Sequence, residues 1–301
     1  MMINNNAGKS QPVKISILEA RKWALTELTA AGLDESESAD NIDFLLTGAL
    51  GINYGMLRAN ITRMLPENIS QVWPQWIAGL INRRPPQYLL GLAPFYGHEF
   101  MVDERVLIPR PETEQLVEWI LKDLKPGMDT LKVLDIGTGS GAIIETLLLA
   151  DARLQGMALD ISEAALNVAQ RNAQRLNVAH ISFIQSDVWQ NLDQQAQFDI
   201  IVSNPPYIDV NQQAKMDQSV KDYEPDLALY ANNQGLAIYQ TIAQDLGQHL
   251  TANGRAYFEI GYDQGPTLVE LFQAAVPDAE VTLKQDFSGL DRMIRVKRHG
   301  N

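Results

Sequence analysis

The pattern that most constrains this chain is the alternation of strands and helices from residue 131 onward. Short apolar runs predict strands at 132–136, 155–159, 180–185 and 198–202, and helical spacing fills 142–150 and 163–175. A helix near 236–250, a strand at 255–260 and a helix near 266–275 continue the series. Repeated strand–helix units of this kind form a parallel sheet with helices on both faces.

The last two predicted strands, 281–284 and 292–296, break this alternation. The residues between them are too few for a crossover helix, so the two strands are expected to pair as an antiparallel hairpin. We therefore predict an α/β fold with a doubly wound, Rossmann-like sheet of seven strands, with the antiparallel hairpin at its edge.

The first eighty-odd residues have helical spacing and no strand pattern. Helices are predicted at 16–31, where Ser16 and Glu19 form a capping box, and at 38–50, 54–65 and 66–82. We interpret 1–84 as a helical bundle, either a packing partner or a substrate-recognition domain. Residues 85–110 are expected to form a linker with a β-hairpin built from the alternation around Phe100 and Val102 and from 106–108. The strand–helix domain then covers 111–301 and opens with a helix to about Lys125.

Composition narrows the range of functions. The 301 residues carry 24 Lys and Arg against 37 Asp and Glu, a net charge of −13, which argues against a general nucleic-acid backbone binder. The lack of cysteine excludes disulfides and thiolate metal sites, and the four histidines have no ligand spacing, so no metal is expected. There is no apolar run of about 18 residues and no signal-peptide pattern at the N-terminus. A cytoplasmic protein with no membrane partner is expected.

A glycine-rich loop follows the first strand of the sheet and opens a helix. It reads Asp135-Ile136-Gly137-Thr138-Gly139-Ser140-Gly141, and its glycines allow a tight turn and a close approach to a ligand. With Ala142 the loop also satisfies the dinucleotide pattern, so a nicotinamide cofactor is an alternative. Asp160, at the end of the second strand, is placed to accept hydrogen bonds from a ribose diol, which both kinds of cofactor carry.

Three features favour S-adenosylmethionine over a dinucleotide. The Asp135 carboxylate at the loop would repel a pyrophosphate and attract the cationic methionine end of S-adenosylmethionine. Asp187, after the third strand, offers an acceptor for an adenine amino group, with Val188 or Trp189 against the ring. The third feature is the sequence after the fourth strand, which lies beside the glycine loop in the expected strand order.

That sequence is Ser203-Asn204-Pro205-Pro206-Tyr207. The two prolines fix the backbone and remove two donors, so nearby carbonyl groups point outward without a ladder partner. A planar group with an NH₂ suits this corner, because Asn204 can accept one N–H, a proline-region carbonyl the other, and Tyr207 can pack against the plane. Taken alone, the motif has the alternative of a stiff turn that binds nothing.

Together these residues resemble the HemK/PrmC family of protein-glutamine methyltransferases, over almost the whole chain from about Ile15. The resemblance includes Tyr88-Leu89-Leu90-Gly91, Leu107-Ile108-Pro109-Arg110-Pro111-Glu112-Thr113-Glu114, the glycine loop, Asn204-Pro205-Pro206-Tyr207, Glu224-Pro225 and Asp291-Arg292. Glu145 departs from the family, which usually has a small or apolar residue there.

The resemblance implies roles for the motif residues. Contacts with S-adenosylmethionine are expected from Asp135, Ile136, Gly137, Thr138, Gly139, Asp160, Val188 and Asn204, in addition to Asp187, the predicted acceptor for the adenine amino group. Contacts with the substrate glutamine are expected from Asn204, Pro205, Pro206 and Tyr207, and catalytic roles from Asn204, Pro205 and Tyr207.

The resemblance also implies a reaction and a partner. Members of the family transfer a methyl group from S-adenosylmethionine to the side-chain amide of the glutamine in the Gly-Gly-Gln motif of class-I peptide chain release factors. No direct nucleic-acid binding is expected. Two alternatives stay open: an enzyme that methylates the exocyclic amine of adenine, which presents the same NH₂ after base flipping, and a non-catalytic module that senses S-adenosylmethionine.

Overall fold

The computed structural model describes residues 14–127, 129–211 and 216–299, which divide into two compact units. The first unit contains the described residues up to Leu92 together with Gln218–Tyr223, and the second contains the remaining described residues. The boundary after Leu92 lies inside the stretch 85–110, which is predicted to be a linker.

The first unit is helical. The Ser16 hydroxyl oxygen accepts the Glu19 N–H at 3.3 Å and the Glu19 carboxylate accepts the Ser16 N–H at 2.7 Å, so the predicted capping box is confirmed. Trp73 is fully buried in the core of this unit, and its indole N–H donates to the Ala20 carbonyl at 3.2 Å. The helices of the unit are α1 (Ile17–Ala30), α2 (Glu35–Leu50), α3 (Tyr54–Ala59), α4 (Glu67–Ile81), α5 (Pro86–Leu90) and α9 (Gln218–Tyr223).

Two of these helices differ from the predicted bounds. α2 begins at Glu35 rather than at residue 38, because the Asp34 side chain caps it by accepting a backbone N–H at 2.9 Å. α3 ends at Ala59 rather than near residue 65. Instead of continuing the helix, the chain beyond α3 forms hydrogen bonds with the segment before α1, where the Leu65 N–H donates to the Ile15 carbonyl at 2.8 Å.

The second unit is built on a seven-stranded sheet with the order β10-β11-β9-β6-β3-β4-β5. β11 runs antiparallel to both of its neighbours, and the other strands are parallel to one another. The predicted parallel sheet and its antiparallel edge hairpin are therefore confirmed. The strands are β3 (Leu131–Ile136), β4 (Leu154–Asp160), β5 (Ile181–Gln185), β6 (Phe198–Ser203), β9 (Leu250–Glu259), β10 (Ala279–Gln285) and β11 (Asp291–Arg298).

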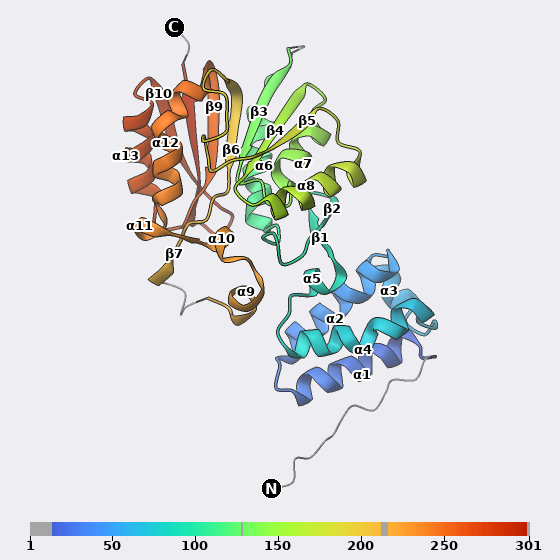
Figure 1. Cartoon of the computed structure of the whole chain (residues 1–301). Coiled ribbons are helices and arrows are strands. Elements are labelled where there is room, and N and C mark those ends of the chain that lie inside the picture. The colour runs from blue at the N-terminus through green and yellow to red at the C-terminus, as the bar shows by residue number, and fades with distance from the viewer. Residues whose placement is uncertain (1–13, 128, 212–215, 300–301) are drawn as a thin grey trace. The chain divides into compact units, whose positions relative to one another are not determined.

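Helices cover both faces of this sheet. Figure 1 shows α6 (Pro111–Asp123), α7 (Ala142–Ala150) and α8 (Glu163–Leu176) on one side, and α12 (Ala237–His249) and α13 (Gly265–Ala275) on the other. Successive residues of a strand point to opposite faces of the sheet. Val133 therefore packs in the core with α6 and α7, whereas Leu134 packs in the core with α12 and α13. Between β6 and α12 the chain forms β7 (Ile208–Asp209), α10 (Asp226–Leu229), β8 (Tyr230–Ala231) and α11 (Asn232–Gly235). Over the described ranges, no helix has the length and apolar character needed to span a membrane.

The hairpin before the sheet is shifted from its predicted position. β1 (Leu92–Phe95) pairs with β2 (His98–Met101), and 106–108 is irregular chain, so the predicted contribution of 106–108 was wrong. Tyr96 and Gly97 form the turn with φ of 48° and 78°, the left-handed backbone of a two-residue type I′ hairpin. Phe95 and Phe100 of this hairpin pack in the core beneath α6.

Candidate active site

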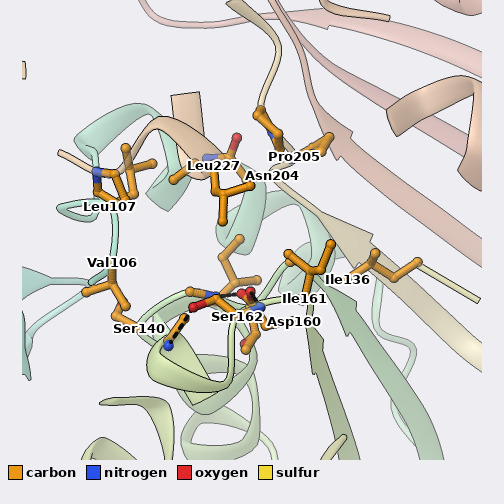
Figure 2. Close-up of a pocket in the computed structure, with 18 of the residues that line it drawn as sticks. Val106, Leu107, Ile136, Ser140, Asp160, Ile161, Ser162, Asn204, Pro205 and Leu227 are labelled. Atoms are coloured by element: carbon orange, nitrogen blue, oxygen red, sulfur yellow. Dashed lines mark hydrogen bonds between the residues drawn. The ribbon is translucent and has the colours of Figure 1, made fainter. Parts of the chain in front are cut away.

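The carboxyl ends of β3, β4, β5 and β6 meet at one edge of the sheet, where a cavity of about 240 Å³ opens. Open α/β sheets bind ligands at this edge. Figure 2 shows Asn204 and Pro205 on one side of the cavity and Ser140, Asp160 and Ser162 on the other. Of the described residues predicted for the site, Asp135 and Tyr207 lie outside the lining. The others line it: Ile136, Gly137, Thr138, Gly139, Asp160, Asp187, Val188, Asn204, Pro205 and Pro206.

The glycine loop is tied to the end of β4 through Asp160. The Gly139 N–H donates to one carboxylate oxygen at 2.9 Å, and the Ser162 N–H donates to the other at 2.9 Å. Gly139 has a φ of 57°, a left-handed conformation that favours glycine. Burial raises the pKa of Asp160, and these backbone hydrogen bonds oppose that shift. Each carboxylate oxygen has two lone pairs, so Asp160 keeps acceptor capacity toward the cavity.

Asp135 lies beneath the loop. Its side chain is fully buried, and its carboxylate accepts the Thr138 hydroxyl at 2.8 Å. Burial raises the pKa of Asp135 to about 7, while the hydrogen bond from Thr138 lowers it. In this structure Asp135 therefore has no exposed surface for the methionine end of a ligand, and it holds the loop through Thr138, which does line the cavity.

Glu145, on α7, is a second buried acid next to the loop. It is fully buried, and within the described part of the chain neither carboxylate oxygen has a hydrogen-bond partner. A Cβ atom at Gly141 would lie 2.1 Å from a Glu145 oxygen, and the φ of 83° at Gly141 also favours glycine. Burial, and then the charge of Asp135, raise the pKa of Glu145 to about 9. No group of acids and histidines among the described residues could hold a metal ion.

The segment after β5 makes a tight turn at the cavity. The Ser186 hydroxyl donates to the Val188 carbonyl at 2.8 Å, and Val188 has a φ of 47°. This backbone is strained for a β-branched residue, and such strain gathers at functional sites. Asp187 is exposed and lines the cavity beside Val188. Trp189, the alternative ring surface, stacks instead on His249 with ring centroids 4.5 Å apart.

The corner after β6 is anchored from behind. The Ser203 hydroxyl donates to the Ile136 carbonyl at 2.6 Å and joins β6 to β3. The side-chain N–H of Asn204 donates to the Thr113 hydroxyl at 3.2 Å, and Thr113 donates to Glu259 at 2.6 Å. The amide oxygen of Asn204 is therefore the atom available to accept a hydrogen bond from a ligand.

Tyr207 supports this corner and is not a wall of the cavity. Its hydroxyl lies 3.5 Å from Glu259, and its ring packs in the core beneath α12. Its backbone carbonyl accepts from the Gln264 side chain at 3.1 Å. A Cβ atom at Gly235 (φ 81°) would lie 2.0 Å from that carbonyl oxygen, so the chain after the prolines is closely confined.

Two residues that shape the site, Glu259 and Leu227, were not predicted from the sequence, whereas Arg110 and Glu224 belong to motifs of the family resemblance. Glu259 is a buried acid at the end of an apolar strand, and that position was the signal that could have found it. Arg110 and Glu224 form an ion pair at 2.6 Å in which the carboxylate is buried, and burial raises the pKa of Glu224 while Arg110 lowers it. Leu227, which lines the cavity, is 66% exposed.

The chain is similar to known methyltransferases in sequence and in fold. Residues 19–91 match the PrmC N-terminal domain and residues 113–222 match the methyltransferase small domain. A release factor glutamine methyltransferase of Lactococcus lactis is 53% identical over 218 residues, 72% of this chain and 79% of that protein. One from Enterococcus faecalis is 41% identical over 276 residues, 91% of this chain and 96% of that protein.

Among solved structures, a methyltransferase from Pyrococcus furiosus has a TM-score of 0.50 at 16% identity, over 69% of this chain and 91% of that chain, and so shares the fold. The sequence relatives extend across both units of the chain, so their similarity is not confined to the widespread methyltransferase sheet. This chain belongs to the release factor glutamine methyltransferase family.

Proposed function

We propose that this chain transfers a methyl group from S-adenosylmethionine to the side-chain amide nitrogen of the glutamine in the Gly-Gly-Gln motif of class-I peptide chain release factors. The observation that carries the proposal is that Asn204 and Asp160 line one cavity. A substrate amide held by Asn204 and a methyl donor held by Asp160 would therefore lie in the same cavity. The names of the sequence relatives support the choice of substrate.

The donor groups of the cavity fit S-adenosylmethionine. Asp160 would accept hydrogen bonds from the ribose hydroxyls, and Asp187 would accept from the adenine amino group beside Val188. The loop from Ile136 to Gly139 would hold the methionine end through its backbone, with Asp135 acting on the loop through Thr138. When bound, S-adenosylmethionine supplies an electrophilic methyl group.

The residues at the corner make the amide nitrogen a better nucleophile. An amide nitrogen reacts poorly because its lone pair is delocalised into the carbonyl group. Asn204 would accept one N–H and the Pro205 carbonyl the other, which orients the nitrogen and favours a pyramidal geometry. Positioning of this kind can supply many powers of ten in rate. No strong base is needed, because the nitrogen loses its proton to water after alkylation.

The remaining assignments follow from the substrate. Release factors act in translation, so we expect the enzyme to work in the cytoplasm. We assign recognition of the release factor to the helical unit, in agreement with its match to the PrmC N-terminal domain. A corner that binds an NH₂ group could also accept the amino group of adenine in a nucleic acid. The net charge of −13 disfavours such a substrate.

The test is a transfer assay with labelled S-adenosylmethionine and two acceptors, a class-I release factor and DNA. Label on the release factor is expected, with an increment of about 14 daltons, one CH₂ group, on the tryptic peptide that carries Gly-Gly-Gln. A release factor with alanine in place of that glutamine is the matched control and should take no label. Label on DNA alone would favour the adenine enzyme, and binding of S-adenosylmethionine without transfer would favour the sensor module.

A further inference from the structure

Asn204, Thr113 and Glu259 form a hydrogen-bond chain that runs from the cavity into the core. Asn204 follows β6, Thr113 lies in the first turn of α6, and Glu259 ends β9. The amide N–H of Asn204 donates to the Thr113 hydroxyl at 3.2 Å, and that hydroxyl donates to the Glu259 carboxylate at 2.6 Å. Thr113 is 4% exposed and Glu259 is 2% exposed, so water does not compete for these groups.

The direction of this chain depends on the group at its buried end. An ionised carboxylate can only accept hydrogen bonds, so Thr113 must donate to Glu259 and is left to accept from Asn204. The amide of Asn204 then turns its N–H toward Thr113 and keeps its oxygen for the substrate. With a donor in place of the carboxylate, Thr113 would donate to the Asn204 oxygen. The Asn204 NH₂ would then face the substrate NH₂, and because both groups are hydrogen-bond donors, they could not bind each other.

We propose that ionised Glu259 is a positioning residue for methyl transfer, which acts through Thr113 and through its own interaction with the Asn204 NH₂ to hold the Asn204 amide oxygen toward the substrate nitrogen. This inference deepens the proposed function and rests on it for the identity of the substrate. The orientation of Asn204 itself rests only on the hydrogen-bond chain.

Groups from several other segments face Glu259. The Tyr207 hydroxyl lies 3.5 Å from its carboxylate, and the Tyr239 hydroxyl of α12 donates to its backbone carbonyl at 2.6 Å. Burial raises the pKa of Glu259 and is the largest influence. Hydrogen bonding from Thr113, the charge of Arg292 on β11 and hydrogen bonding from the Asn204 side chain lower it, and the charge of Glu112 on α6 raises it. If the carboxylate is required, activity should be lost on acidification at a pH above the ordinary glutamate value of 4.5.

Three near-isosteric variants test the chain. Thr113→Val removes the hydroxyl and Thr113→Ser keeps it, whereas Glu259→Gln replaces the pure acceptor with a group that can donate. We expect Thr113→Ser to stay within a few-fold of the wild-type kcat, and Thr113→Val and Glu259→Gln to lower kcat by about 10- to 100-fold. The Kd for S-adenosylmethionine should rise no more than it does in Asn204→Ala. The double variant should be no slower than either single one, because both act through Asn204.

The pH profile separates positioning from a structural role. The wild-type kcat should fall on the acid side as Glu259 takes up its proton, and that limb should be missing in Glu259→Gln. A wild-type kcat in Thr113→Val, or losses that multiply in the double variant, would overturn the proposal.

A second measurement does not depend on turnover. In protein labelled with ¹⁵N-asparagine, the side-chain signal absent from Asn204→Ala reports the hydrogen bond to Thr113. The chemical shift of this signal should be unchanged in Thr113→Ser and should move in Thr113→Val and in Glu259→Gln. An identical Asn204 signal in all these proteins would also overturn the proposal. If the wild-type enzyme methylates no release factor, the proposed function fails, and this signal still decides the orientation of Asn204.

Discussion

Replacing Glu145 with glutamine should make the second unit more stable relative to the wild type as the pH rises. Glu145 is fully buried, and its pKa is about 9 in the folded protein against 4.5 for an ordinary glutamate. A group whose pKa rises on folding contributes its full stability below the unfolded pKa and loses it as the pH climbs to the folded pKa. The wild-type protein therefore loses stability between these two values. Glutamine keeps the shape of the side chain and is neutral at every pH.

The size of the effect follows from the two pKa values. Each pH unit between them is equivalent to about 1.4 kcal/mol. The free energy of unfolding of Glu145→Gln should therefore rise relative to that of the wild type by about 4 kcal/mol between pH 5.5 and pH 8.5. Asp135, with a pKa of about 7, titrates in both proteins and largely cancels in the difference. While Glu145 is neutral, it places no charge beside Asp135, and so it does not change the titration of Asp135 relative to the variant.

Urea denaturation of the cofactor-free protein at several pH values measures this difference. The matched control is Glu270→Gln, which changes an exposed glutamate on α13 in the same unit. Its stability should follow the wild type at every pH. A difference between Glu145→Gln and the wild type that stays constant from pH 5.5 to pH 8.5 would refute the reasoning, because Glu145 would then carry the same charge in both states.

Three further changes test the site. Asn204→Ala should abolish methyl transfer and weaken S-adenosylmethionine binding only modestly, and full activity would contradict the acceptor role. Asp160→Ala should raise the Kd of S-adenosylmethionine by about tenfold or more in calorimetry, since it removes charged acceptors, and an unchanged Kd would remove it from the site. Arg110→Met leaves the buried Glu224 carboxylate without its cation, so hydrogen exchange at 224–231 should speed up. Arg298→Met, whose acidic partner is 52% exposed, is the control and should leave that exchange unchanged.

The sequence predicted which residues gather at the cavity. Asp160 and Asn204 each stand at the end of a predicted parallel strand, and parallel strands bring those ends to one edge whatever the packing elsewhere. The glycine loop follows the same rule, because Gly137 and Gly139 come directly after β3. The hairpin of β10 and β11 was predictable for an equally local reason, since too few residues separate the two strands for a crossover.

The directions of individual side chains were not predictable. Asp135 stands where a ligand contact was expected, yet its carboxylate turns under the loop to Thr138. Tyr207 turns back to Glu259, which lies on another strand. The partner of Asn204 is Thr113, a residue 91 positions earlier in the chain.

Strand and helix periodicity, together with the order of the segments, determined this protein's sheet and the edge where its motifs meet, because those features depend on neighbours in the chain. Only the tertiary structure decided which atoms face the cavity and which acids are buried. A rotamer and a hydrogen-bond partner depend on segments that meet only after the sheet has closed, as α6 and β9 do behind Asn204.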